Sequence, residues 1–226
     1  MKRSFQCAFG AAALLLSSSA WAQDFSAKGQ LAISAERLFG FYHDSATTTV
    51  GGVQSTVKSD SFTLLSSPVG LGGSPTWTYG APRVAGDYFI IDHLSLGGAL
   101  GYSHISVSNP FGANATVSTS GDSFLFAPRV GYAFAFNNIV GIWPRGGFTY
   151  RTLSAGNQSA HDFALTLEAP FFFTVIPHVA FWAGPTLDIG LGGGASNTNG
   201  AGQTTTVDFN STEIGIQTGL VAYFDL

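Results

Sequence analysis

Apolar and polar residues alternate one by one along eight stretches of this chain. In the stretch Asp122–Phe136, every second residue from Phe124 onward is apolar, whereas the positions between them are mostly small and include Arg129. A period of two predicts a β-strand whose two faces meet different surroundings. The other alternating stretches are Gln30–Tyr42, Arg83–Ile91, Leu94–Ser106, Ile139–Thr152, His161–Phe173, Val179–Leu191 and Asn210–Leu226.

The connections between these predicted strands alternate in length. The long ones are rich in Gly, Ser, Thr and Asn: His43–Pro82, Val107–Gly121, Leu153–Ala160 and Gly192–Phe209. The short ones lie around Asp92–His93, Asn137–Asn138 and Thr174–His178. Long connections at one end and tight turns at the other are typical of outer-membrane barrels.

The composition favours a chain that lies in lipid. Charged residues make up 10% of it, against about 25% in a soluble domain. Yet no run reaches the roughly 18 apolar residues of a spanning helix. In lipid every backbone N–H and C=O needs an internal partner, so strands cross only as a closed barrel. The sequence therefore predicts an all-β fold, a single eight-stranded antiparallel up-and-down transmembrane β-barrel whose interior is filled by side chains.

The first residues predict a secretory signal peptide. Lys2 and Arg3 precede an apolar run at 8–16, and Ala20 and Ala22 frame a cleavage site. We expect a signal peptide at 1–22 and one barrel domain at 23–226. Nine basic residues less Lys2 and Arg3 leave seven, against thirteen acidic residues, and the one cysteine, Cys7, lies in the signal. With no basic patch, nucleic acid is excluded as a partner.

The chain resembles the small outer-membrane β-barrel proteins of Gram-negative bacteria. The signal, the eight segments and the terminal GLVAYFDL carry this resemblance, although the family usually ends in an aromatic residue and here Phe224 precedes Leu226 by two. The stretch GQLAISAERLFGF at 29–41 also resembles the first strand of uncharacterised myxobacterial barrels. The resemblance implies a location in the bacterial outer membrane, among lipid and lipopolysaccharide. It also implies assembly by the barrel-assembly machinery, which reads the C-terminal strand.

Several charged residues fall on the small faces, which the alternation turns into the lumen. They are Glu36, Asp87, Arg129, Arg145, Arg151, Glu168, Asp188 and Glu213. A confined charge needs a partner whatever the protein does, so a structural network of arginines and carboxylates is the simplest interpretation. A gate or ion path, and hence a small-solute channel, is the alternative. Arg37, in contrast, falls on the predicted lipid face.

The predicted register brings two arginines together. A three-residue turn after Ala135 would set Arg129 directly opposite Arg145. Like charges facing each other across two strands are unfavourable. We therefore expect Glu168 and Glu36 to reach between them in a central cluster.

The most enzyme-like feature is the pair His104 and Ser106, two residues apart on the lipid-facing side of a predicted strand. It resembles the His-x-Ser pair of outer-membrane lipid A deacylases, in which an acidic residue orients the histidine. No such acidic partner is evident in the sequence, so a lipid A-modifying hydrolase is only a second alternative. The histidines lack metal-ligand spacing. We predict no enzyme activity, no metal and no cofactor.

Taken together, these patterns favour a porin-like barrel of the cell envelope. Its predicted role is structural or one of surface interaction, because no strong catalytic motif accompanies the architecture. The loop 43–82 is the best candidate for contact with an extracellular ligand, because it is the longest of the predicted external loops.

Overall fold

The computed structural model describes residues 25–65, 79–110 and 116–226, and for 105–110 and 116–119 it describes the backbone only. The signal peptide predicted at 1–22 lies outside the described residues. The strands are β1 (Gln30–Val50), β2 (Val53–Leu64), β3 (Arg83–Ile91), β4 (Leu94–Pro110), β5 (Thr116–Tyr132), β6 (Phe134–Ala135), β7 (Val140–Ile142), β8 (Arg145–Ala155), β9 (Gln158–Glu168), β10 (Phe171–Ile176), β11 (Val179–Thr198) and β12 (Thr204–Asp225). Among these residues, no helix has the length and hydropathy needed to cross a membrane.

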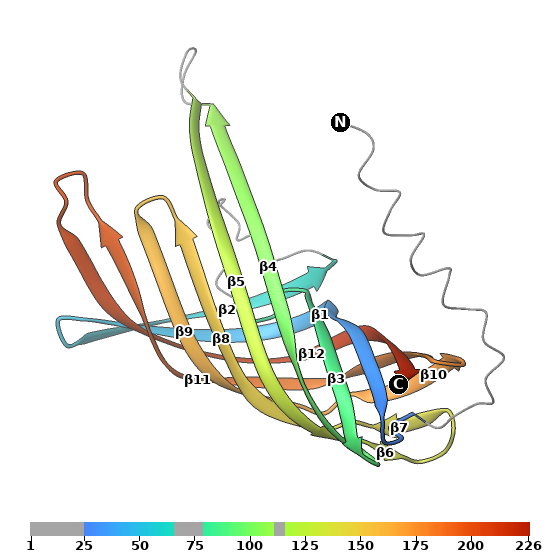
Figure 1. Cartoon of the computed structure of the whole chain (residues 1–226). Helices are drawn as coiled ribbons and strands as arrows, with labels where there is room; N and C mark the ends of the chain where they lie inside the picture. The colour runs from blue at the N-terminus through green and yellow to red at the C-terminus, as the bar shows by residue number, and fades with distance from the viewer. Residues whose placement is uncertain (1–24, 66–78, 111–115) are drawn as a thin grey trace.

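The strands form a closed antiparallel barrel, in agreement with the sequence-based prediction (Figure 1). The barrel wall has eight staves, each of which is one strand or two consecutive strand segments in line. They are β1, β3, β4, β5 with β6, β7 with β8, β9 with β10, β11 and β12. The ring is closed by β12, which pairs with both β11 and β1. Two staves are interrupted at Pro144 and Pro170, because proline has no N–H for the ladder. The prolyl carbonyls still accept hydrogen bonds, Pro144 from the N–H of Tyr132 at 2.9 Å and Pro170 from that of Trp143 at 2.8 Å.

The two faces of each stave meet different surroundings, as the alternation predicts. On β5, Phe124, Phe126 and Val130 are exposed on the outer surface, whereas Ala127 and Arg129 are buried in the lumen. The aromatic face therefore forms the lipid-facing wall. The arginine points inward, where small neighbours leave room for it.

The first long connection is more ordered than its composition indicates. β1 continues to Val50, and β2 folds back along it, from Val53 opposite Val50 to Leu64 opposite Phe39. The prediction of a loop at 43–82 is therefore wrong for the first half of that segment, which forms a β-hairpin. Figure 1 shows this hairpin leaning to one side, away from the upright β4–β5 hairpin. Residues 66–78 of the predicted loop lie outside the described residues.

A bulge in β1 overturns the placement of Arg37 on the lipid face. Between Ala35 and Phe39, β1 advances four residues while β12 advances two, from Leu220 to Thr218. Arg37 takes a positive φ of 54° in this bulge. Consequently Arg37 is fully buried in the lumen, and the alternation resumes with Phe39 facing outward. An irregularity of this kind re-aims a side chain without changing the rest of the strand.

The predicted register between the fourth and fifth staves is also wrong. Ala135 pairs with Gly141, so the turn is two residues longer than expected. As a result Arg129 lies opposite Gly147 rather than opposite Arg145. A side chain at position 147 would place its Cβ 2.8 Å from the Cα of Arg129, so glycine makes this close approach feasible. The two-residue shift keeps both arginines on the lumen side.

A layer of aromatic rings fills the end of the lumen next to the short turns. Phe25, which precedes β1, inserts there and packs its ring centroid 5.4 Å from that of Phe89, 5.2 Å from Trp143 and 4.6 Å from Phe172. Tyr223 completes the cluster at 5.1 Å from Phe25. Fully burying one such ring contributes about 1.5–3 kcal/mol. This aromatic layer seals the lumen at the end that carries the short turns.

A charge placed on the lipid face of β9 tests the assignment of the two faces. Leu167 faces outward between two buried neighbours in the apolar band, and Leu167→Arg should cost about 2–4 kcal/mol of unfolding free energy in lipid vesicles. Ser159→Arg lies on the same face of the same strand beyond that band and should cost about 0–1 kcal/mol. Equal costs in urea titrations of the two refolded variants would contradict the assignment.

Candidate functional site

Glu36 lies at the centre of a charged layer above the aromatic rings. Its carboxylate accepts hydrogen bonds from Arg129 Nη1 at 2.7 Å, Arg145 Nη1 at 2.7 Å and Arg83 Nε at 2.9 Å. Arg129 Nη2 donates a fourth at 2.7 Å and Ser34 Oγ a fifth at 2.9 Å. The side chain is fully buried. Three arginines therefore share one carboxylate. Burying these charges away from water is costly, and direct contact between opposite charges offsets that cost.

Glu168 is the second shared carboxylate of this layer. Arg145 Nη2 lies 2.8 Å from its Oε2, Arg37 Nη2 lies 3.3 Å from its Oε1, and Arg83 Nη2 also donates to Oε1. Gln217 Nε2 adds a neutral hydrogen bond at 3.0 Å. The structure thus brings together the four residues of the expected cluster, and Glu36 and Glu168 separate Arg129 from Arg145.

Arg37 neutralises a pair of like charges on β11 and β12, the two strands next to β1 on one side. Asp188 and Glu213 lie directly opposite each other on β11 and β12, an unfavourable pairing by itself. Arg37 Nη1 lies 3.0 Å from Asp188 Oδ2 and 3.6 Å from Glu213 Oε1. The bulge that turns Arg37 inward is therefore what makes this carboxylate pair tolerable.

Tyr79 closes the lumen above the charged layer. It lies in the short segment before β3, and its side chain is fully buried. Its carbonyl accepts from Arg37 Nη1 at 2.6 Å, and its hydroxyl donates to Asp162 Oδ2 at 2.7 Å. Arg151 holds Asp162 through two hydrogen bonds of 2.9 and 2.7 Å and places its guanidinium 3.8 Å from the Tyr79 ring centroid.

The charged and aromatic layers are joined by cation–π contacts. The guanidinium carbon of Arg145 lies 4.9 Å from the ring centroid of Trp143 and 5.0 Å from that of Trp182. Such contacts are stronger where water is excluded. Side-chain contacts therefore connect Phe25 to Tyr79 through the aromatic layer and the charged layer.

Charges of both signs are concentrated in this interior. All five arginines that follow residue 22 are buried there: Arg37, Arg83, Arg129, Arg145 and Arg151. The buried carboxylates are Glu36, Asp87, Asp162, Glu168, Asp188 and Glu213. In the part of the chain that is described, no group of three or more His, Cys, Asp or Glu residues could hold a metal ion. The arrangement neutralises charge and has the geometry of a salt-bridge network.

At least four residues of the lumen were not predicted from the sequence: Arg37, Arg83, Tyr79, and Asp162, which lies on the same inward side of β9 as Glu168. Arg83 shares its inward side with Asp87 on β3, and that parity alone would have identified it. Arg37 carried a signal too, because an arginine on a lipid face is expensive and indicates a break in the alternation. Tyr79 gave no such signal, since an aromatic residue in a polar loop has many explanations.

The His104 and Ser106 pair has an acidic neighbour that the sequence did not reveal. Asp122 lies opposite His104 on β5, and its Oδ1 is 2.8 Å from His104 Nδ1 and 2.7 Å from the hydroxyl of Tyr102. The cluster is exposed on the outer surface. The side chain of Ser106 lies outside the described part, so only its backbone position opposite Ser120 is known.

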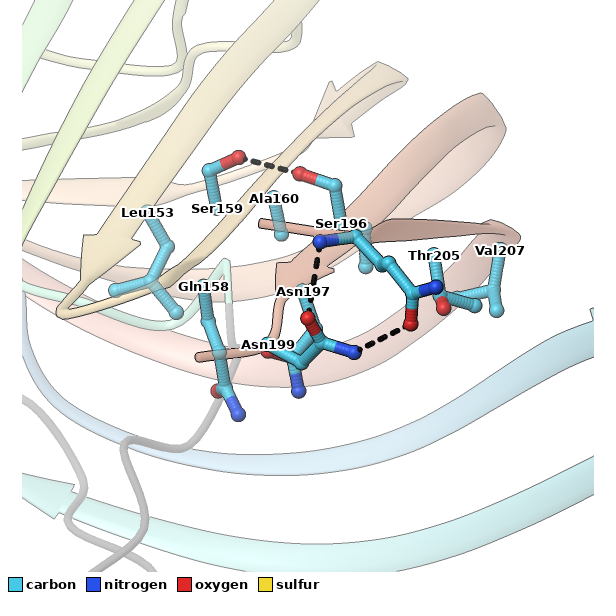
Figure 2. Close-up of a pocket in the computed structure, with 11 residues that line it drawn as sticks. Leu153, Gln158, Ser159, Ala160, Ser196, Asn197, Asn199, Thr205 and Val207 are labelled. Carbon is cyan, nitrogen blue, oxygen red and sulfur yellow. Dashed lines mark hydrogen bonds between the residues drawn. The ribbon is translucent and has the colours of Figure 1, made fainter. Parts of the chain in front are cut away.

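A pocket of about 510 Å³ opens between the β8–β9 and β11–β12 hairpins, beyond the lumen (Figure 2). Its lining is neutral, with Leu153 and Val207 beside the amides of Gln158 and Asn197. Among the lining residues, Asn199 Nδ2 donates a hydrogen bond of 3.0 Å to Gln203 Oε1. Such a surface suits an uncharged partner better than an ion, since no formal charge lines it.

Comparison with known proteins supports the fold. No family model and no curated protein matches the chain. Among solved structures, the outer-membrane protein OprG from Pseudomonas aeruginosa matches with a TM-score of 0.56 and 11% identity, covering 90% of this chain and 100% of that chain. The outer-membrane protein AlkL, solved in lipid bilayers, matches with a TM-score of 0.55 and 9% identity, covering 92% and 96%.

The chain therefore has the fold of small outer-membrane β-barrels of Gram-negative bacteria, and the predicted outer-membrane location agrees with that fold. At these identities the likeness concerns architecture alone. The myxobacterial likeness stays a prediction.

Removing Glu168 tests whether the charged layer acts as one unit. Glu168→Ala removes one of the two carboxylates that Arg83 and Arg145 share, together with one partner of Arg37, and should cost up to about 3–5 kcal/mol of unfolding free energy. Adding Arg145→Ala should recover part of that loss, because one uncompensated charge disappears with it. Urea unfolding in lipid vesicles, followed by tryptophan fluorescence, measures both effects.

The control double variant combines Glu168→Ala with Arg151→Ala, whose arginine pairs with Asp162 higher in the lumen. Its coupling energy should be much smaller than that of the Arg145 pair. If the Arg145 double variant is simply the sum of its single variants, the two residues do not act together.

Proposed function

We propose that this protein is a closed outer-membrane barrel whose lumen has a structural role and whose external hairpins interact with other molecules at the cell surface. The observation that carries the proposal is the filled lumen. Buried aromatic rings, the shared carboxylates Glu36 and Glu168, and Tyr79 follow one another along the barrel axis.

The charged layer argues against an open ion path. A conducting pore needs sites that an ion can enter and leave, whereas here each guanidinium is already in contact with a carboxylate. Opening a route would require breaking buried ion pairs, and stranding one such charge costs about 3–5 kcal/mol. A small-solute channel is therefore the less favoured function.

The external hairpins support an interaction role. β4, β5, β11 and β12 continue well past the apolar band, and the β1–β2 hairpin adds a further surface. The neutral pocket between the β8–β9 and β11–β12 hairpins offers a concave site among them. Extended strands hold such surfaces more rigidly than loops of the same length would.

The lumen proposal is tested by conductance. Folded protein reconstituted in a planar bilayer should give no uniform current steps, because the three filled layers leave no continuous path. Tyr79→Ala should also stay closed, since the charged layer lies beneath it. A preparation with an added general porin shows that insertion can be detected. Uniform steps that vanish when the protein is boiled would favour the channel alternative instead.

The hydrolase alternative is tested by lipid A analysis. The His104–Asp122 hydrogen bond is the observation that favours it, and exposure to lipid fits such a substrate. We expect no change in the mass spectrum of lipid A when folded protein is expressed in a Gram-negative host. Loss of an acyl chain that is abolished by both Ser106→Ala and Asp122→Asn would establish the enzyme and contradict the proposal.

A further inference from the structure

The outer face of β11, β12, β1 and β2 changes from apolar to polar row by row. Residues that lie opposite each other in the ladder form rows across these strands. The first row is Pro185, Ile216, Phe41 and Phe62; the second is Leu187, Ile214, His43 and Asp60; the third is Ile189, Thr212, Ser45 and Lys58; the fourth is Asn210, Thr47 and Thr56; and the fifth is Asp208, Thr49 and Gln54.

The lower rows form a hollow rather than a flat belt. A groove of about 700 Å³ is lined by Phe41, Phe62, Pro185 and Ile216. The rings of Phe41 and Phe62 contact each other at a tilt of 40°, with centroids 4.8 Å apart, and Phe41 is 68% exposed. Because the groove is continuous with the lipid-facing wall, its occupant in the membrane is an apolar chain.

The upper rows form a second hollow with a different lining. This groove, of about 630 Å³, is lined mainly by hydroxyl and amide side chains, among them Ser45, Thr47, Gln54 and Asn210, and also by Asp208 and Phe209. Thr47 and Thr56 share a hydrogen bond of 2.9 Å at its edge. Hydroxyl and amide groups both donate and accept hydrogen bonds, so they match the hydroxyls of a sugar.

A positive charge lies between the two grooves. Of the seven basic residues beyond residue 22, five are the lumen arginines and Lys28 lies beside the short turn at Asp92. The seventh, Lys58, is exposed opposite Ser45, one row above the pair of His43 and Asp60. His43 Nδ1 lies 2.8 Å from Asp60 Oδ1, so that carboxylate is already engaged, and Asp208 lies two rows further away.

We propose that this face binds a phosphorylated glycolipid of the outer leaflet, with an acyl chain in the apolar groove, a phosphate at Lys58 and the sugar on the hydroxyl and amide rows. The order of the three surfaces along the strands equals the order of the three parts of such a lipid. The proposal names a partner for the surface role given above. It does not depend on the closed lumen, so a conducting barrel would leave it standing.

The test measures binding of lipid A by native mass spectrometry in a neutral polyoxyethylene detergent. The probes are diphosphorylated lipid A and the same lipid A after removal of its phosphates. Wild-type protein should bind the phosphorylated form roughly fivefold more tightly, from one lysine at a membrane surface. Lys58→Gln should abolish that preference, whereas the matched Lys28→Gln should keep it.

A second pair of variants separates the groove from the general lipid belt. Phe41→Ala with Phe62→Ala should weaken binding of both probes by roughly tenfold or more, because both rings contact the acyl chain. Phe148→Ala with Phe163→Ala removes another outward-facing aromatic pair, with centroids 5.3 Å apart, and should leave binding unchanged. Folding of every variant is checked by its faster migration on a detergent gel before boiling.

Three outcomes would overturn the proposal. They are equal binding of the two probes by wild-type protein, equal losses in the two phenylalanine double variants, and a lipid-free dimer that occupies the groove instead. A preference for phosphatidylethanolamine over both lipid A probes would also overturn it, because the sugar rows would then have no role.

Discussion

Lipid outside the barrel forces the five arginines beyond residue 22, together with six carboxylates, into one narrow interior. The outer wall is aromatic and aliphatic, so the five arginines have no place there, and all five are buried in the lumen. Inside, none of them is stable without a carboxylate. The pairing between the arginines and the buried carboxylates therefore constrains the rest of the structure. Where a carboxylate is shared, as Glu36 is among three arginines, the strands that carry those arginines have fixed positions around it.

The bulge in β1 links this charge constraint to the shape of the wall. Glu36 is the last residue of β1 that pairs with β3, opposite Arg83, and Phe39 is the first that pairs with β2. Between them Arg37 turns inward, binds Asp188 and also holds the carbonyl of Tyr79. One irregularity thus neutralises the carboxylates of β11 and β12, anchors the chain that returns to β3, and directs the β1–β2 hairpin away from β4.

The side of the barrel wall that each strand residue faces could be predicted from the sequence, because period-two alternation indicates directly which face meets lipid. It placed Arg129, Arg145 and Glu168 on the lumen side, and the structure gathers them around shared contacts. Register could not be predicted in the same way. A turn two residues longer than expected moved Arg129 opposite Gly147 and left every parity unchanged, so no sequence pattern signalled it. The β1–β2 hairpin was missed for a related reason, because Ser- and Thr-rich strands exposed to water on both faces lack hydrophobic alternation.

The lumen and the outer surface place different demands on the same strands. A lumen residue such as Glu168 is fixed by several partners at once, so a change there disturbs the whole network. On the outer face the requirement is looser, since any apolar side chain can meet lipid. A specific arrangement on that face therefore needs a cause of its own. Lys58 stands out for this reason, because it carries a charge on the outer surface, beside a groove with two aromatic rings and rows of hydroxyl groups. Only a ligand that is itself apolar, anionic and hydroxylated along its length would satisfy all three surfaces together.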